Sequence, residues 1–328
     1  MLERSKSALG IGLIGVGRHG SRYLHHLLHD LPEVSLTAVC RRTGGEPLTD
    51  RRIPMYNDFR AMIADRNVQA VVVVTPPSLN HDICLEAAHA GKPILIEKPL
   101  ATNGRDARAM VAAANRAGIV MMTAQTLRFD PTIVLMKEQI EPIQPLRSAR
   151  LFSHIETKPN IMAGATGPVQ TGALLELGIH LLDLVRFVTG QEISEARCTM
   201  SPLPSIAPET SAQVQLKTTG NILCTLDIAR VDDDRVGMAE WVGQTGMVTG
   251  DWPKRLVTRA MRDKPSERWA VESRPTVLAT LEAFVQAVVT KTPPPITGLD
   301  GCRAVEIADA CYRSAADNGA TVTLTLNR

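Results

Sequence analysis

Aromatic residues make up only 3% of this 328-residue chain, so its core must be aliphatic. No apolar run is long enough to cross a bilayer. No two of the six cysteines form a CxxC pair, and most lie in apolar runs, as in reduced core residues of a cytoplasmic protein. The formal net charge of +2 is too small to attract nucleic acid or an anionic membrane. The glycine-broken N-terminal apolar stretch lacks a small-residue cleavage site, so we expect no signal peptide.

The first 124 residues alternate strand-like and helix-like segments. Ala70–Val74 is a β-branched run without polar alternation, which is typical of a parallel strand buried on both faces. This alternation predicts right-handed βαβ units, and therefore an α/β Rossmann domain with a doubly wound parallel sheet over residues 1–124. The other predicted strands are Ile11–Ile14, Ser35–Cys40, Pro93–Glu97 and Ile119–Thr123, and the predicted helices are Ser21–His29, Arg60–Ala64, His81–Ala90 and Arg105–Ala117.

Beyond Ala124 the pattern changes to strands joined by hairpin turns. Gly220-Asn221 is a favourable hairpin turn, and Ala239–Gly250 carries two glycines inside a strand pattern, which suggests a further hairpin. We therefore expect residues 125–328 to form an α+β domain with a large, mostly antiparallel open sheet. Its other expected elements are the strands Leu146–His154, Ile193–Thr199, Ala212–Lys217 and Ile222–Ala229 and the helices Val277–Thr290 and Cys302–Asp317.

A glycine loop, GVGRHG, follows the first predicted strand directly. Gly15 permits the tight turn, Gly17 lets the backbone approach a pyrophosphate, and Gly20 lets helix and strand pack closely. Arg18 and His19 lie within the same loop. The loop predicts dinucleotide binding, although a tight turn without a ligand and the glycine loop of a methyltransferase are the alternatives.

The end of the second predicted strand bears on the choice of cofactor. Domains that prefer NAD place an acidic residue there to bind the ribose 2′-hydroxyl. Here Arg41 and Arg42 stand where an acid is expected, and two guanidinium groups suit a 2′-phosphate. We therefore predict that NADP is preferred and that NAD is possible; the alternative is a pair of exposed arginines without a ligand.

Two further motifs end predicted parallel strands. Glu97 and Lys98 precede Pro99 in GKPILIEKP, and Thr75-Pro76-Pro77 stops the β-branched strand. Active sites of open α/β sheets lie beyond the carboxyl ends of the strands, so Lys98 is expected to point into the cofactor crevice. The alternative is a surface ion pair of Glu97 and Lys98, which the presence of both the glycine loop and the Thr75-Pro76-Pro77 stop disfavours.

With these motifs the chain resembles the Gfo/Idh/MocA family, which includes glucose–fructose oxidoreductase and inositol dehydrogenase. The resemblance covers nearly the whole chain through GVGRHG, TPPSLNH with His81, GKPILIEKP, TGALLELGIHLLDLVRF and AVEIADACYRSAADNGATVTL. It implies NAD(P) on the Rossmann domain, substrate between that domain and the open sheet, and a homodimer or homotetramer formed through the sheet. The residues expected to contact the cofactor are Gly15, Gly17, Arg18, His19, Gly20, Arg41, Arg42, Thr75, Pro76, His81, Glu97, Lys98 and Gln125.

Residues Gly172–Val188 read as one helix that is apolar almost all round and is therefore buried. Glu176, His180 and Asp183 share one stripe of it, which must find partners or line a cleft. A buried histidine satisfied by Glu176 is the alternative to a catalytic one.

The family resemblance implies that His180 is the proton acceptor beside Lys98. Glu176 stands where similar proteins carry an aspartate, and it is expected to orient His180 or to hold a substrate hydroxyl. Lys98 would stabilise charge on the reacting oxygen while His180 removes its proton and hydride leaves for the nicotinamide. We expect Asp183 to act at most through other residues.

Other polar residues give weaker indications. Gln125, Arg128 and Asp130 follow the last Rossmann strand and either touch the ligands or cap the next helix. His25 and His29 have metal-ligand spacing, but no third ligand lies nearby in sequence, so we expect no metal.

The sequence thus predicts an NADP(H)-preferring oxidoreductase acting on a hydroxyl or carbonyl carbon of a sugar, cyclitol or related polyol. A catalytically idle NAD(P)-binding regulator on the same fold is the alternative, and a methyltransferase is the second. The absence of an acid after the second strand and the presence of Lys98 and His180 argue against these rivals.

Overall fold

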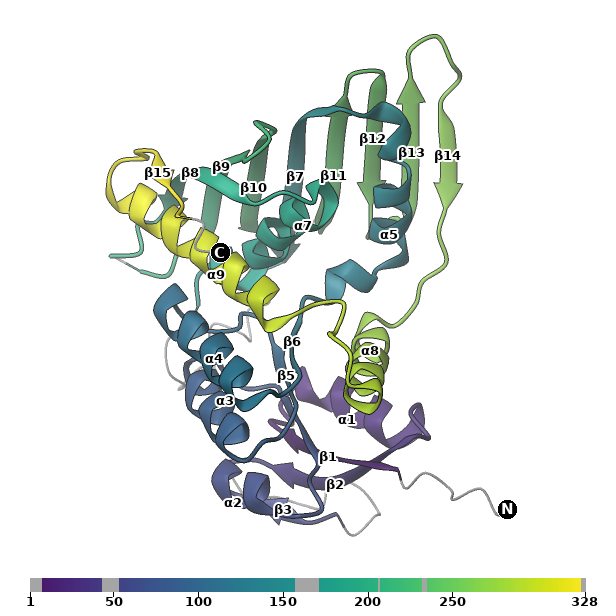
Figure 1. The fold of residues 1–328 in the computed structure, drawn as a ribbon. Coiled ribbons are helices and arrows are strands. Elements are labelled where there is room, and N and C mark those ends of the chain that lie inside the picture. Colours follow the sequence, from purple (N-terminus) through teal and green to yellow (C-terminus); the bar gives the residue numbers. More distant parts are fainter. Residues whose placement is uncertain (1–7, 43–52, 157–170, 206, 232–234, 326–328) are drawn as a thin grey trace. The chain divides into compact units, whose positions relative to one another are not determined.

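The computed structural model describes residues 8–42, 53–156, 171–205, 207–231 and 235–325 (Figure 1). Two compact units comprise Met1–Thr126 with Pro275–Cys302, and Leu127–Arg274 with Arg303–Arg328. The sequence analysis placed every residue after 124 in the second domain. Here α8 (Thr276–Thr290) belongs to the first unit because it contacts α1 (Gly20–His29) and β6 (Met121–Ala124).

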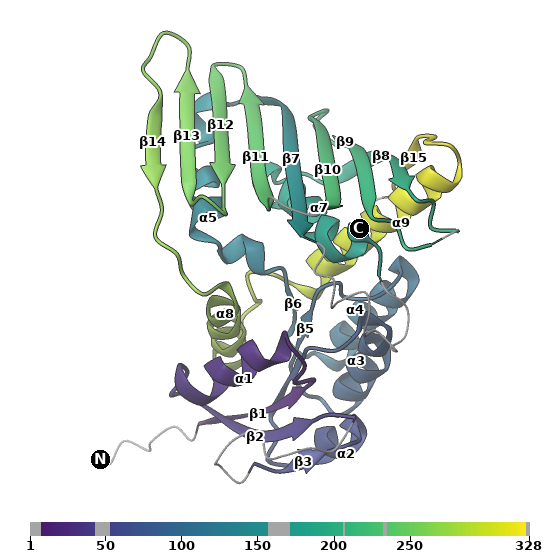
Figure 2. The same cartoon turned by 180° about the vertical axis from the view of Figure 1, so that it is seen from behind.

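The first unit is a six-stranded parallel sheet in the order β3-β2-β1-β4-β5-β6, so the predicted doubly wound fold is confirmed. Helices α1 and α8 cover one face, and α2, α3 and α4 cover the other (Figure 1 and Figure 2). The β-branched run forms the centre of the sheet, where Val71, Val72 and Val73 are wholly buried. The other elements are β1 (Leu9–Ile14), β2 (Val34–Cys40), β3 (Met55–Tyr56), α2 (Phe59–Ala64), β4 (Ala70–Val73), α3 (Asn80–His89), β5 (Ile94–Glu97) and α4 (Gly104–Ala117).

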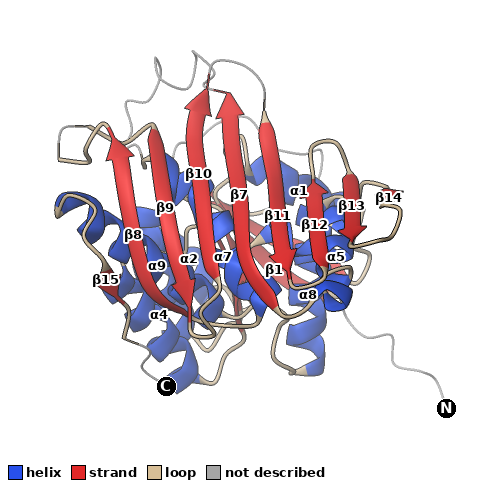
Figure 3. Ribbon diagram, turned by 90° about the horizontal axis from the view of Figure 1, so that it is seen from above, coloured by secondary structure: helices blue, strands red, loops and turns tan. Residues whose placement is uncertain are grey.

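The second unit is built on a nine-stranded sheet in the order β14-β13-β12-β11-β7-β10-β9-β8-β15. Every pair is antiparallel except β7 with β10, as the sequence predicted for most of this sheet. Helices α5, α7 and α9 lie against one face, which Figure 3 shows behind the strands. The elements are α5 (Pro131–Glu138), β7 (Leu146–Glu156), α7 (Ile179–Thr189), β8 (Ile193–Ser201), β9 (Ser211–Thr218), β10 (Leu223–Val231), β11 (Val236–Gly243), β12 (Gly246–Asp251), β13 (Leu256–Met261), β14 (Glu267–Ala270), α9 (Gly298–Ala316) and β15 (Val322–Thr323).

The alternation of apolar and polar residues along the strands explains why helices cover only one face of this sheet. Along β9, Ala212, Val214 and Leu216 are buried while Gln213 and Gln215 face outward, which is the period-two pattern of a strand with one covered face. The apolar face packs on the helices, and the other face is polar with a few exposed apolar side chains.

All six cysteines are buried, as their apolar surroundings predict. Burial raises the pKa of the Cys84 thiol to about 12, so at neutral pH it stays protonated. Among the described helices, none combines the length and the apolar character that a bilayer span requires.

Candidate active site

The glycine loop connects β1 to α1, and its three glycines serve three different purposes. Gly15 adopts a φ of 92°, a left-handed conformation that side chains disfavour. A Cβ on Gly20 would stand 2.2 Å from the Gly15 carbonyl oxygen, so only glycine allows this close packing. A Cβ on Gly17 would meet nothing within 4 Å, so this point of the loop is open to a ligand. Arg18 and His19 are exposed beside it.

The other predicted cofactor residues lie just after the carboxyl ends of the strands, at one edge of the sheet. The Gly15 amide donates to the Cys40 carbonyl at 2.9 Å, which puts the end of β2 directly beside the glycine loop. Arg41, half-buried, and Arg42, exposed, follow Cys40 immediately. On the other side of β1, the Val74 amide donates to the Ile14 carbonyl at 2.8 Å. Thr75 and the exposed Pro76 continue from there.

The carboxylate of Glu97 links the end of β5 to the glycine loop. It is 5% exposed and accepts hydrogen bonds from the Tyr23 hydroxyl at 2.6 Å and the Lys98 amide at 2.9 Å, and it contacts His19 Nε2 at 2.7 Å. Burial, with the charge of Glu97, raises the pKa of Tyr23 well above its usual value, so the hydroxyl stays protonated and donates. Glu97 is therefore bound within the protein and is not half of a surface ion pair with Lys98.

Asn80 holds the backbone that follows Lys98. Its amide, 1% exposed, donates to the carbonyls of Pro99 at 3.2 Å and Leu100 at 3.1 Å, and its oxygen accepts from the Thr75 hydroxyl at 2.8 Å. The ends of β4 and β5 are thereby joined through one side chain. The neighbouring His81, which belongs to the TPPSLNH motif, contacts the side chain of the adjacent Asp82 at 3.0 Å.

Gln125 is the last predicted cofactor residue in the first unit, directly after β6. Its side chain is 1% exposed, and neither amide atom has a hydrogen-bond partner among the described residues. Buried amides without partners are costly, so this one calls for a polar ligand. Together with the open loop at Gly17, it shows that the strand-end residues fit a nicotinamide dinucleotide.

In the second unit the predicted single helix over Gly172–Val188 is divided. Leu174–Gly178 forms a π-helical turn, and α7 begins at Ile179. The wider turn interrupts the regular helical period from which the shared stripe of Glu176, His180 and Asp183 was predicted. Glu176 forms an ion pair with Arg230 at the end of β10, and the half-buried His180 stands one turn further on. Arg230 also donates to the Thr171 carbonyl at 3.4 Å.

A second buried carboxylate, Glu209, holds the start of this π-helical turn. It is 2% exposed and accepts hydrogen bonds from the Leu174 amide at 3.0 Å and the Tyr312 hydroxyl at 2.9 Å. Burial, with the charge of Glu209, raises the pKa of Tyr312 far above its usual value, so this hydroxyl also donates. Gly172 lies so close that any side chain there would collide with the carboxylate.

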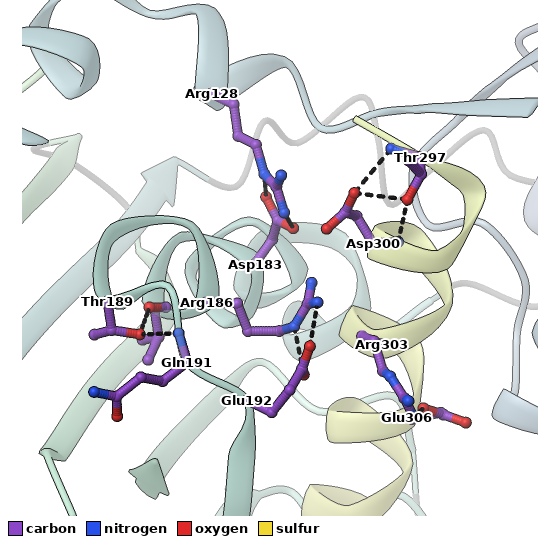
Figure 4. Close-up of polar contacts among 11 residues, drawn as sticks. Arg128, Asp183, Arg186, Thr189, Gln191, Glu192, Thr297, Asp300, Arg303 and Glu306 are labelled. Atoms are coloured by element: carbon purple, nitrogen blue, oxygen red, sulfur yellow. Dashed lines mark hydrogen bonds and ion pairs between the residues drawn. The ribbon is translucent and has the colours of Figure 1, made fainter. Parts of the chain in front are cut away.

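Asp183 is fully engaged by Arg128. Two hydrogen bonds of 2.7 and 2.6 Å join the guanidinium to the carboxylate, and both side chains are buried (Figure 4). Asp183 therefore ties α7 to Arg128, in keeping with the expectation that it acts at most through other residues. Asp130 accepts from the Thr132 amide and caps α5, which is the alternative role considered for it.

The sequence did not single out Tyr23, Asn80, Glu209 or Arg230. Asn80 and Arg230 bond to residues that are about 20 and 54 positions away, and such pairs leave no local pattern. The one available signal was the position of Asn80 and Tyr23 in or beside motifs that had already been recognised.

Comparison with known proteins identifies the family to which these units belong. Residues 9–125 match the model of the oxidoreductase family with an NAD-binding Rossmann fold, and residues 152–249 match the GFO/IDH/MocA C-terminal domain. The chain belongs to the GFO/IDH/MocA family of NAD(P)-dependent oxidoreductases. The sequence resemblance is thereby confirmed for both domains.

Individual members of the GFO/IDH/MocA family match along nearly the whole chain. The myo-inositol 2-dehydrogenase of Thermotoga maritima is 26% identical, with 93% of this chain and 95% of that protein covered. Inositol 2-dehydrogenase 2 of Saccharopolyspora erythraea is 27% identical, with 94% and 93% covered. The structure of scyllo-inositol dehydrogenase from Lactobacillus casei, with bound NAD(H) and scyllo-inositol, superposes with a TM-score of 0.83 at 20% identity, covering 96% of this chain and 99% of that one. At that identity the superposition shows a shared fold.

Proposed function

We propose that this protein is an NADP(H)-preferring dehydrogenase that acts on a hydroxyl or carbonyl carbon of a sugar, cyclitol or related polyol. The proposed preference for NADP rests on Arg41 and Arg42, because they directly follow the end of β2, whose backbone bonds to the glycine loop. An aspartate or glutamate there would repel a 2′-phosphate, whereas two guanidinium groups attract it. The substrate class rests on relatives named as inositol dehydrogenases.

The proposed chemistry divides among three side chains. Bound nicotinamide supplies the hydride acceptor in oxidation and the donor in reduction. Lys98, at the end of β5, donates a hydrogen bond to the reacting oxygen and stabilises its developing negative charge. His180 accepts the hydroxyl proton, as imidazoles do near neutral pH. The amide of Gln125 and the backbone amides at Gly17 bind the polar groups of the dinucleotide.

The ion pair with Arg230 defines what Glu176 does in this scheme. Its side chain is 43% exposed while that of Arg230 is 18% exposed, so one side of the carboxylate is bound and the other stays accessible. Beside that guanidinium, Glu176 acts as a hydrogen-bond acceptor for a substrate hydroxyl or for His180. The extra methylene of glutamate over aspartate gives it the reach to Arg230.

Titration of the purified protein with NADPH and NADH tests the cofactor proposal. We expect NADPH to bind at least about tenfold more tightly, because charge-assisted hydrogen bonds to a phosphate contribute about 1.5–3 kcal/mol. The Arg41→Ala/Arg42→Ala variant should bring the two dissociation constants to parity by weakening NADPH alone. Cofactor fluorescence reports both constants. Arg22→Ala, an exposed arginine on α1, is the control.

Equal binding of the two cofactors, or tighter binding of NADH, would contradict the role of the arginines without affecting the rest of the proposal. Binding of either cofactor should be followed by a screen of sugars, cyclitols and other polyols for cofactor reduction. If the protein bound cofactor and formed stable complexes with partners but reduced no carbonyl and oxidised no polyol, the idle regulator would be favoured instead.

We further propose a homodimer or homotetramer that pairs the open faces of the nine-stranded sheets. The strand register places Met247, Val242, Ser148 and Leu223 side by side across β12, β11, β7 and β10 (Figure 3). Three of these are exposed apolar side chains. Light scattering of the purified protein should give a dimer or tetramer mass, and Val242→Arg should lower it. A monomer at micromolar concentration would contradict the proposal.

A further inference from the structure

The C-terminal end of α1 brings together side chains that the proposed function does not use. His25 and His26 lie on the last turns of the helix, and Asp30 is the residue that ends it. One ring nitrogen of each histidine and one carboxylate oxygen of Asp30 all lie within 4.8 Å of one another. The sequence prediction considered only His25 and His29, whereas the structure brings the nearby His26 and Asp30 within ligand distance of His25 and corrects the expectation that no third ligand is close.

We propose that His25, His26 and Asp30 form a surface binding site for a divalent zinc ion. Two imidazoles and one carboxylate, with water in the fourth position, are a ligand set that zinc accepts in tetrahedral geometry. The site uses neither the glycine loop nor the strand-end residues, so it is independent of the proposed oxidoreductase activity.

The distances fit one ion after small movements. Zinc binds nitrogen and oxygen ligands at about 2.0–2.2 Å, so ligand atoms on one tetrahedral ion stand about 3.4 Å apart. His25 Nε2 is 3.8 Å and His26 Nδ1 is 2.6 Å from Asp30 Oδ2. The side chains of His25 and Asp30 are 63% and 36% exposed, so they can move toward a shared ion without repacking the core.

The electrostatic setting also favours a cation. The last carbonyls of a helix carry partial negative charge, and Asp30 adds a full one. His29 lies close as well, with its ring 5.0 Å from that of His25, and can replace the water ligand after a rotation. The bound ion would join the last turn of α1 to the residue that terminates it, and thereby stabilise the helix that begins at the glycine loop.

Calorimetric titration of the tag-free, chelator-treated protein with zinc chloride tests the proposal. We expect one zinc ion per chain with a micromolar dissociation constant, and no binding of magnesium, which prefers oxygen ligands. Asp30→Asn and His26→Ala should each raise the dissociation constant at least about tenfold, as loss of a ligand does. His89→Ala, an exposed histidine at the end of α3, is the matched control and should change nothing.

Cobalt provides a second measurement that does not depend on affinity alone. Cobalt bound by two imidazoles and a carboxylate in tetrahedral geometry should give visible absorption bands that Asp30→Asn weakens. NADPH affinity should be the same with and without zinc. Failure to bind zinc below about 100 µM, or binding that both ligand variants leave unchanged, would overturn the site, and neither result would affect the proposed dehydrogenase.

Discussion

Lys98→Met is expected to lower kcat for polyol oxidation by about a hundredfold to a thousandfold while NADPH binds almost as before. A preorganised donor aimed at developing charge contributes about 2.7–4 kcal/mol to transition-state stabilisation, and methionine retains the length of the side chain without the charge. The proposed dinucleotide contacts of the glycine loop and of the Gln125 amide are left in place by the substitution. Steady-state kinetics with the best substrate of the polyol screen, together with fluorescence titration of NADPH, measure the two effects separately.

The matched control is Lys254→Met, because Lys254 is 78% exposed and its ammonium pairs with the nearby Asp251 at 3.0 Å. It should leave both kcat and NADPH affinity within about twofold of the unchanged protein, as expected for a surface ion pair. A Lys98→Met variant with nearly normal kcat would exclude Lys98 from the chemistry. A variant that no longer bound NADPH would assign Lys98 to cofactor binding instead.

Asn80→Ala tests the proposed role of Lys98 with a smaller expected effect on kcat. The amide of Asn80 donates to the Pro99 and Leu100 carbonyls directly after Lys98, so its loss should displace Lys98 without removing the charge. We expect a smaller reduction in kcat, about tenfold, with little change in KM. Asn80→Asp retains the oxygen that accepts from Thr75 but loses the donor, and therefore should resemble Asn80→Ala. A reduction in kcat that only parallels a loss of thermal stability would indicate that Asn80 has a purely structural role.

The Rossmann half could be predicted almost strand by strand because its signals are local. The run Ala70–Val73 is apolar and wholly buried, and Gly20 packs closely against the Gly15 carbonyl of the same loop. The strand ends then follow from topology, since parallel strands finish at one edge of the sheet. Lys98 was assigned to that edge on this ground, and the structure places it directly after β5.

What could not be predicted depends on contacts between distant residues. The sequence predicted the helix Val277–Thr290 but not the unit against which it packs. The helical period over Gly172–Val188 was read as uniform, whereas Glu209, from another part of the chain, holds the Leu174 amide where the π-helical turn begins. Similarly, nothing near Glu176 in the sequence indicated that its carboxylate would meet Arg230.

The pair Arg128–Asp183 leads to the second prediction with a large expected effect, a loss of stability. The two side chains are only 9% and 2% exposed, and the guanidinium also lies over the ring of Phe187, 5.1 Å from its centroid. Asp183→Leu leaves the positive charge of Arg128 buried without its partner, which costs about 3–5 kcal/mol. In thermal unfolding this corresponds to a Tm lowered by about 10 °C.

Two further variants separate the cost of burying the Arg128 charge without Asp183 from the smaller cost of losing a surface hydrogen bond. Arg128→Met/Asp183→Leu removes both charges and should recover most of the lost Tm, because an uncharged pair has no desolvation penalty. Glu192→Gln weakens the similar but more exposed contact with Arg186, in which the glutamate is 36% exposed, and should cost less than about 1 kcal/mol (Figure 4). If the single and double variants melted at the same temperature, the buried charge would not be the cause. Because α7 carries both Asp183 and His180, an Asp183 variant that still folds should also lose activity as α7 becomes less ordered. That result would show that the buried pair holds the proposed proton acceptor in position.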